Sequence, residues 1–231
     1  MREIDAAALE ALREELASHG LRLESDARRR AEYAYDASIY RVPPVGVVFP
    51  KTAADLVVIA RACSTHGVPM APRGGGTSLA GNSIGPGLVV DVSRYMRGIA
   101  EPDVEARTIR AEGGVILSVL RSNVETATDG ALTFAPDPSS HTRVCVAGAI
   151  GNDACGNHSV KYGRMSDSIV SLEVVTADGA HLLATEGGIR AIDGADSHSV
   201  TRAVEIGREL CARLDENMAR FRTGLETMPR Q

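Results

Sequence analysis

The spacing of hydrophobic residues changes character near residue 45. Upstream of it, apolar residues recur every three or four positions after Asp5, a residue type that favours helix N-caps. This spacing predicts a helix over residues 5–18. A second short helix is expected over residues 26–34, before two consecutive prolines. We therefore expect an N-terminal helical segment at residues 1–45.

Short runs of apolar and β-branched residues follow, each bounded by glycine or proline. This pattern is typical of strands in a small sheet. Thr52 as a cap and apolar residues at helical spacing predict one helix between the first two runs. Together these elements would form a first lobe at residues 46–110. We expect strands over residues 45–49, 68–72 and 88–92, and a helix over residues 52–66.

Residues 111–231 are expected to form a second lobe. β-branched residues indicate a strand at 108–111, at the junction of the lobes, and a pair of glycines is expected to start a helix over 115–123. Strands flanking an Ala-Asp-Gly turn at residues 177–179 predict a hairpin. A long helix is expected over residues 199–221. Its spacing predicts that Val200, Val204, Cys211, Leu210 and Leu214 face the core.

Composition excludes several functional classes. The 231 residues carry a net charge of −5, so nucleic acid has no general electrostatic attraction to the chain. No run approaches the roughly 18 apolar residues of a membrane-spanning helix. The N-terminus has the acidic, Arg-rich pattern of a helix and not that of a signal peptide. Four widely separated cysteines are expected to be reduced thiols of a cytoplasmic protein.

The most informative stretch is glycine-rich and lies between the second and third predicted strands. Residues 74–76 are consecutive glycines, which permit positive φ and let successive backbone N–H groups point into one concavity. Thr77 and Ser78 add hydroxyl donors, and Arg73 adds a positive charge. Because a pyrophosphate binds such groups, we interpret this stretch as a phosphate-binding loop and not as a plain surface loop.

Two common phosphate-binding motifs do not match this loop. The run from Gly76 to Ser83 approaches the P-loop pattern, but Asn82 stands where that pattern requires lysine. NTP hydrolysis is therefore not expected. No G-x-G-x-x-G motif lies between a strand and a helix with an acidic residue about 20 positions further on, so a Rossmann site is not expected either.

Several motifs occur in the order typical of one flavoenzyme superfamily. They are Pro72 to Asn82, Pro136-Asp137-Pro138-Ser139-Ser140, Gly148-Ala149-Ile150-Gly151-Asn152, Ala154-Cys155-Gly156, Tyr162-Gly163 and Ile169 to Gly179. On these motifs, about residues 40–215 resemble the FAD-binding domain of the vanillyl-alcohol oxidase and p-cresol methylhydroxylase superfamily. The chain is most similar to D-lactate, glycolate and D-2-hydroxyglutarate dehydrogenases, above all to the large bacterial members with an iron–sulfur region.

The resemblance implies an α+β fold of the p-cresol methylhydroxylase type, with FAD extended between two lobes. Residues 73–78 would hold the pyrophosphate, residues 136–156 would line the flavin and ribose, and the backbone near Ile169 would meet the adenine. Small residues in an apolar run permit this close approach. The implied cofactor-binding residues are Pro72, Arg73, Gly74, Gly75, Gly76, Thr77, Ser78, Gly81, Asn82, Pro136, Asp137, Ser139, Gly148, Gly151, Asn152, Ala154, Gly156, Tyr162, Gly163 and Ile169.

The resemblance also implies how FAD is attached. Singly linked relatives carry a histidine in the glycine-rich loop, and this chain has none there, so non-covalent FAD is expected, although His158 or Cys155 could in principle form a link. The chain departs from the family pattern twice. Ala147 stands where relatives usually have glycine, and Asp153 stands where they usually have asparagine.

A zinc site is the main rival interpretation of the same region. His141, Cys145, Cys155 and His158 supply the nitrogen and sulfur donors that zinc prefers. The apolar, glycine-rich residues between them favour a segment that lines a ligand, so no metal is expected. His158 is also a candidate general base, because histidine titrates near neutrality.

Relatives continue into a second flavin-domain segment and a substrate-binding cap, and we expect the catalytic residues to lie in that missing C-terminal region. In the intact enzyme, a small 2-hydroxy acid would give up hydride to FAD. An iron–sulfur centre or a quinone is a candidate electron acceptor, and the enzyme would be cytoplasmic or peripheral to the inner membrane. Two alternatives stay open: a flavin-binding module without turnover, and a sugar or alcohol oxidase or UDP-sugar reductase on the same domain.

Overall fold

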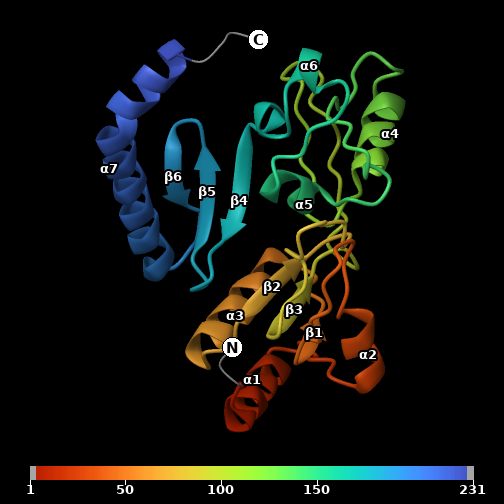
Figure 1. Ribbon diagram of the computed structural model, residues 1–231, viewed down its shortest axis with the longest axis vertical. Coiled ribbons are helices and arrows are strands. Elements are labelled where there is room, and N and C mark those ends of the chain that lie inside the picture. The colour runs from red at the N-terminus through yellow and green to blue at the C-terminus, as the bar shows by residue number, and fades with distance from the viewer. Residues whose placement is uncertain (1–3, 228–231) are drawn as a thin grey trace. The chain divides into compact units, whose positions relative to one another are not determined.

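The computed structural model describes residues 4–227, which form two compact units (Figure 1). The first unit comprises residues 4–170 together with residues 177–179, and the second comprises Ser171–Thr176 together with residues 180–227. Helices and sheets occur in both units, as expected for an α+β fold. The division of the chain at residues 45 and 110 stays a prediction.

The N-terminal helices begin where aspartate side chains cap them. α1 (Ala6–Ser18) follows Asp5, whose carboxylate accepts a hydrogen bond from the backbone N–H of Ala7 at 3.2 Å. α2 (Ala27–Glu32) follows Asp26, which accepts from the N–H of Arg29 at 3.0 Å. These bonds satisfy N–H groups that the first turn of a helix leaves unpaired, so both helix starts confirm the sequence prediction.

The first sheet has three parallel strands in the order β1-β3-β2. A capping box between Thr52 and Asp55 starts α3, which connects the first two strands. The prolines of the second strand are accommodated because that strand lies at an edge of the sheet. The elements are β1 (Gly46–Val48), α3 (Ala53–Thr65), β2 (Met70–Arg73) and β3 (Leu88–Asp91).

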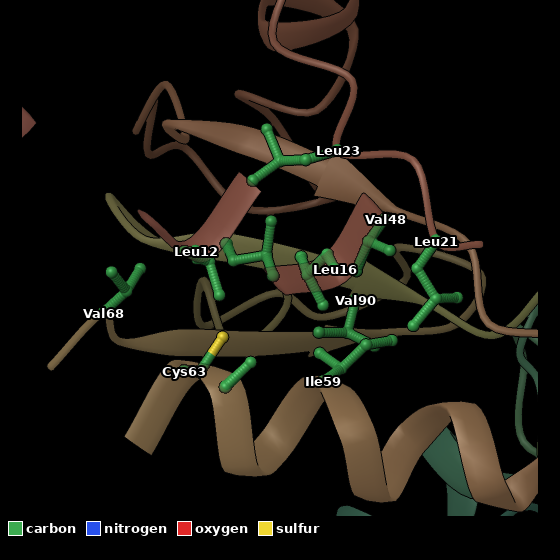
Figure 2. Packing of buried hydrophobic residues seen from close by; sticks show 11 residues of the cluster. Leu12, Leu16, Leu21, Leu23, Val48, Ile59, Cys63, Val68 and Val90 are labelled. Atoms are coloured by element: carbon green, nitrogen blue, oxygen red, sulfur yellow. The ribbon is translucent and has the colours of Figure 1, made fainter. Parts of the chain in front are cut away.

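Both faces of this sheet are covered, which explains why β1 and β3 are buried apolar runs that do not alternate. Figure 2 shows one face, where Val48 and Val90 pack with Leu16 of α1 and Ile59 of α3. Val47, Val89 and Ala71 form a separate cluster with Tyr33 and Phe49. The sheet therefore gives a rigid base to the loop that leaves β2.

A second core within the first unit supports the segment that follows residue 99. Its helices are α4 (Leu117–Ala127), α5 (Val146–Gly151) and α6 (Ser159–Tyr162), with a short 3-10 turn at Ser166–Ser168. The buried residues of this core are Val115, Leu117, Leu120, Val124, Val144, Val146, Ala149 and Met165. Because α4 and α5 share this core, the backbone of α5 has a fixed position within the first unit.

The second unit is an antiparallel sheet with one long helix against it. Ala203 and Ile206 of the helix pack with Ala180, Leu182 and Ile189. Its elements are β4 (Ser171–Val175), β5 (His181–Thr185), β6 (Gly188–Ala191) and α7 (Ser197–Thr227). The predicted hairpin of β4 and β5 is confirmed.

Two predictions for the second lobe were wrong in detail. Residues 108–111 form only isolated bridges, Asp103 with Thr108 and Ile99 with Ala111, because the left-handed Arg107 (φ 54°) closes a tight local turn there. The helix expected over 115–123 is α4, which starts and ends later. The helices α5 and α6, the 3-10 turn and strand β6 were missed, because elements of three to six residues are too short to show a clear periodicity.

The predicted inner face of the long helix was also wrong. Val200, Val204, Leu210 and Leu214 are 47–56% exposed, and Cys211 is exposed too. The helix has 31 residues and so is about 46 Å long, whereas strands of four or five residues span about 17 Å or less, so its later turns extend past the sheet. Within residues 4–227, no helix combines the length and hydropathy needed to cross a membrane.

Candidate functional site

The glycine-rich loop leaves β2 and presents unpaired backbone donors. Gly76 has a left-handed conformation (φ +65°). The N–H groups of Gly76, Thr77 and Ser78 have no acceptor among residues 4–227. Ser78 turns its hydroxyl inward, where it accepts from the N–H groups of Ala80 and Asn82 at 3.2 and 3.1 Å. The loop is therefore a bend with successive free N–H groups, the backbone arrangement that binds anions.

Two glycines of this loop are required by close packing against a neighbouring segment. A Cβ on Gly75 would lie 2.1 Å from the carbonyl oxygen of Arg143, and a Cβ on Gly74 would lie 2.9 Å from the Cβ of Cys145. Both distances are too short for a methyl group, and the atom that Gly75 would meet belongs to the backbone and cannot turn away. The loop is thus held directly against the segment that leads into α5.

Arg73 places a positive charge beside the loop, where hydrogen bonds to the protein hold it in place. Its guanidinium donates to the carbonyl oxygens of Tyr35 at 2.8 Å and Ser83 at 3.3 Å. It also lies 5.0 Å from the ring centroid of Tyr33, within the range of a cation–π contact. A Cβ on Gly76 would meet this guanidinium at 2.6 Å, so the positive charge lies directly behind the loop backbone.

The helix α5 presents a face without side chains. Val146, Ala149 and Ile150 point into the second core, whereas Gly151 has open space at the position of a Cβ. Gly148 would make only an ordinary contact, 3.8 Å from Val144. Neither glycine has positive φ. Glycine inside a helix costs about 1 kcal/mol relative to alanine, so packing and backbone conformation do not explain these two glycines.

A side-chain contact joins the loop to α5. The amide nitrogen of Asn82 lies 3.4 Å from the side-chain oxygen of Asn152, the residue after the last turn of α5. Asn152 also donates to the carbonyl oxygen of Gly148 at 3.0 Å. The free N–H groups of the loop and the bare face of α5 therefore belong to one continuous region of the first unit.

Asp137 acts as a clamp between two predicted site segments. Its carboxylate accepts from the backbone N–H of His158 at 3.1 Å and lies 2.5 Å from Nδ1 of that ring. The bond from His158 holds the pKa of Asp137 below its usual range. Gly156 lies so close that a Cβ would meet the Asp137 carbonyl oxygen at 2.1 Å. His158, the candidate base, thus has an orienting partner that the sequence did not reveal.

Some of the remaining predicted site residues are buried or pack against the second core, and others are exposed. Pro136 is buried, Ser139 and Tyr162 are exposed, and Ala154 and Ile169 pack against the second core. Gly163 is left-handed (φ +80°), and a Cβ there would meet the carboxylate of Asp167. No contact given by the structure joins Tyr162, Gly163 or Ile169 to the glycine-rich loop, so their predicted cofactor role stays a prediction.

The two departures from the family pattern have local explanations. Asp153 has φ +45°, a conformation that aspartate and asparagine tolerate better than most residues. Its carboxylate accepts from the N–H of Ser166 at 3.0 Å, which lowers its pKa, and pairs with Arg164 at 3.1 Å. Ala147 is exposed and faces Gly113, where a Cβ would lie 2.9 Å from the Ala147 methyl group.

The four candidate zinc ligands are not gathered around one point. Cys145 is buried behind Gly74, His141 lies 3.1 Å from the carbonyl oxygen of Pro138, and His158 contacts Asp137. Cys155 is exposed. Among the described residues, no group of three or more His, Cys, Asp or Glu side chains has a geometry suited to a metal ion.

The same geometry predicts which cysteines react. Burial raises the pKa of Cys63 to about 12, and burial together with Asp91 raises the pKa of Cys145. Because the thiolate is the nucleophile, these two should be inert at pH 8, whereas the exposed Cys155 and Cys211 should react quickly. Titration with Ellman's reagent should count two fast thiols in the native protein and four after denaturation. Three or more fast thiols in the native protein would contradict this burial pattern.

Sequence reasoning missed the residues that hold the loop from behind. These are Tyr35, Asp36 and Ala37, which make hydrogen bonds to residues of the loop, and Arg143, which contacts Gly75. Only the Asp-x-Ser spacing at residues 36–38, typical of a side-chain-closed turn, could have drawn attention to the first group. Two surface hollows, one beside α4 and one at residues 20–26, contain none of the predicted site residues.

Comparison with known proteins decides the family. The model of the FAD binding domain matches residues 44–184, which include the glycine-rich loop and α5. The chain belongs to this FAD binding domain family. The solved xylooligosaccharide oxidase from Myceliophthora thermophila, 24% identical, matches 77% of the chain and 37% of its own length with a TM-score of 0.65. The expected FAD-binding fold of the p-cresol methylhydroxylase type is thereby confirmed.

Curated relatives of this FAD binding domain are longer proteins. The D-2-hydroxyglutarate dehydrogenase of Pseudomonas putida is 37% identical over 182 residues, which are 75% of this chain and 17% of the relative. Glycolate oxidase subunit GlcD of Bacillus subtilis is 36% identical over 152 residues, which are 65% of this chain and 32% of the relative. The chain therefore spans less than a third of the length of each.

The described residues fit FAD on structural grounds alone. The free N–H groups of Gly76, Thr77 and Ser78, with the Arg73 charge behind them, suit a pyrophosphate. The open Cβ position at Gly151 suits a flat group that approaches the backbone of α5. Both features lie in the first unit and are joined through Asn82 and Asn152.

Proposed function

We propose that this domain holds FAD non-covalently for a flavin-linked oxidoreductase that oxidises a 2-hydroxy acid. The observation that carries the proposal is the loop at Gly76–Ser78, whose backbone donors are unpaired and lie beside the bare face of α5. When bound, FAD would supply the hydride acceptor, and the protein would supply binding and orientation.

Each part of the site would have a defined task. The loop N–H groups and Arg73 would neutralise the pyrophosphate, and the glycines of α5 would let the flat cofactor lie against the helix backbone. Asp137 would hold His158 in one orientation. The predicted cofactor-binding residues that make no contact with the loop, among them Tyr162 and Ile169, would complete the site near the ribose and adenine.

The substrate class rests on the curated relatives. The two relatives described above carry names of hydroxy-acid enzymes at 36–37% identity, whereas the sugar oxidase is 24% identical and shares the fold. A 2-hydroxy acid is therefore the better-supported substrate, and a sugar or alcohol oxidase is the weaker alternative. The cap, the catalytic residues, and an iron–sulfur or quinone acceptor would belong to further polypeptide of the intact enzyme.

The proposal predicts that the purified chain retains flavin. After incubation with excess FAD and removal of free ligand, we expect visible flavin absorption that is released by denaturation, because the binding is non-covalent. A colourless protein would contradict cofactor binding by this domain. With the full-length gene product, 2-hydroxy acids should reduce an artificial electron acceptor and oligosaccharides should not. The opposite preference would favour a sugar oxidase.

A further inference from the structure

The glycine-rich loop is held by a segment more than thirty residues away in the sequence. We propose that residues 35–38, named here the strap, are a positioning element that holds the pyrophosphate loop in its binding conformation, and that Asp36 is its central residue. This inference rests on the proposed FAD-binding function. It assigns a role to residues that lie outside the matched family region, residues 44–184.

The strap contacts the loop at its beginning, middle and end. At the beginning, Arg73 donates to the carbonyl oxygen of Tyr35 at 2.8 Å. In the middle, the N–H of Ala37 donates to the carbonyl oxygen of Gly76 at 3.0 Å. Because Gly76 is the left-handed residue that turns the loop, this bond fixes the orientation of the following N–H groups.

At the end of the loop, Asp36 makes the anchoring contacts. Its carboxylate accepts from the hydroxyl of Ser83 at 3.0 Å and from the Ser83 N–H at 3.4 Å. Its other oxygen accepts from the N–H of Ser38 at 2.9 Å, which closes the strap on itself. Because Ser83 is buried, removal of the Asp36 carboxylate would leave its hydroxyl without a hydrogen-bond partner, which costs free energy.

The electrostatics of Asp36 agree with this role. Partial burial would raise the pKa of Asp36, but hydrogen bonds from Ser38 and Ser83 outweigh that effect and lower the pKa. The carboxylate is therefore ionised at neutral pH and accepts charge-assisted bonds, which are stronger than neutral ones. Arg73 adds a second connection, since it also donates to the carbonyl oxygen of Ser83 at 3.3 Å.

If the strap preorganises the loop, its loss should lower the affinity for ligands that contain a pyrophosphate. It should also reduce the protection of the loop's backbone amides against hydrogen exchange. We expect Asp36→Ala to weaken the binding of both FAD and ADP about tenfold, by a similar factor for each, as when a ligand must order its own site. Amide hydrogen exchange should accelerate in residues 74–83 and stay unchanged in α4. Asp36→Asn, which keeps one acceptor oxygen, should lie between wild type and alanine.

The matched control is Asp55→Ala. Asp55 also accepts two backbone N–H bonds, from Lys51 and Thr52, and its loss should lower the melting temperature by removing the capping box. It should not change FAD affinity or exchange in residues 74–83. If the Asp36→Ala variant bound FAD with wild-type affinity and showed wild-type exchange in residues 74–83, the proposed role of the strap would be wrong. If wild-type protein itself fails to bind FAD, the proposed function fails, while exchange in the ligand-free Asp36→Ala variant still tests the strap.

Discussion

Gly75→Ala is expected to eliminate tight FAD binding, with an affinity loss of about 100-fold or more. The added Cβ would lie 2.1 Å from the Arg143 carbonyl oxygen and 3.0 Å from its carbonyl carbon, so the loop or the segment behind it must move. Overpacking of this kind costs about 1–3 kcal/mol in stability, and a further loss follows because displaced N–H groups no longer converge on one anion. Isothermal titration with FAD, together with thermal unfolding, measures both effects.

A control glycine distinguishes the effect of the steric clash at Gly75 from any general effect of replacing glycine with alanine. Gly187→Ala lies in the turn before β6, where a Cβ would meet only the Thr185 hydroxyl at 3.6 Å, so stability and FAD affinity should both stay near wild type. If Gly75→Ala bound FAD as tightly as Gly187→Ala does, the loop would not be the pyrophosphate site. The close approach of Gly75 to Arg143 would then serve packing alone.

The sequence predicted the sheet of the first unit well because its signals are local. Thr52 and Asp55 form the capping box in which Thr52 was expected to start a helix, and the apolar runs at β1 and β3 are buried on both faces. The loop glycines were recognised from composition and order. What makes Gly75 necessary, however, is the carbonyl oxygen of Arg143, which lies 68 positions further along the chain, and no local pattern reports such a contact.

Errors arose where tertiary contacts overrule local pattern. In α7, Val200 and Val204 were expected to face the core, yet the sheet packs on Ala203 and Ile206. The small Ala203 lets the helix approach the strands closely, an advantage that hydrophobicity alone does not capture. The bonds that hold the Arg73 charge in place, to the carbonyl oxygens of Tyr35 and Ser83, were not predicted, because Tyr35 lies 38 positions earlier in the sequence.

The two glycines of α5 offer a test in which stability and binding change in opposite directions. Gly148 lies inside a helix, has ordinary φ and would meet no atom closer than 3.8 Å if it carried a Cβ. Replacing it with alanine or leucine should therefore stabilise the ligand-free protein by about 0.5–1 kcal/mol through helix propensity. A side chain there would also occupy the space in which we place the flat part of FAD.

We expect Gly148→Leu to weaken FAD binding about 100-fold and Gly148→Ala to weaken it about tenfold, since overpacking costs about 1–3 kcal/mol and each 1.4 kcal/mol is a factor of ten. Gly207→Leu is the matched control, because Gly207 lies in α7 with open space at its Cβ and should gain similar stability at unchanged affinity. Urea unfolding and FAD titration of the three variants measure the two effects separately. A Gly148→Leu protein that is more stable and still binds FAD at wild-type strength would mean that the bare face of α5 does not contact the cofactor. Weakened binding would instead assign this glycine to the cofactor site, because packing requires no glycine there.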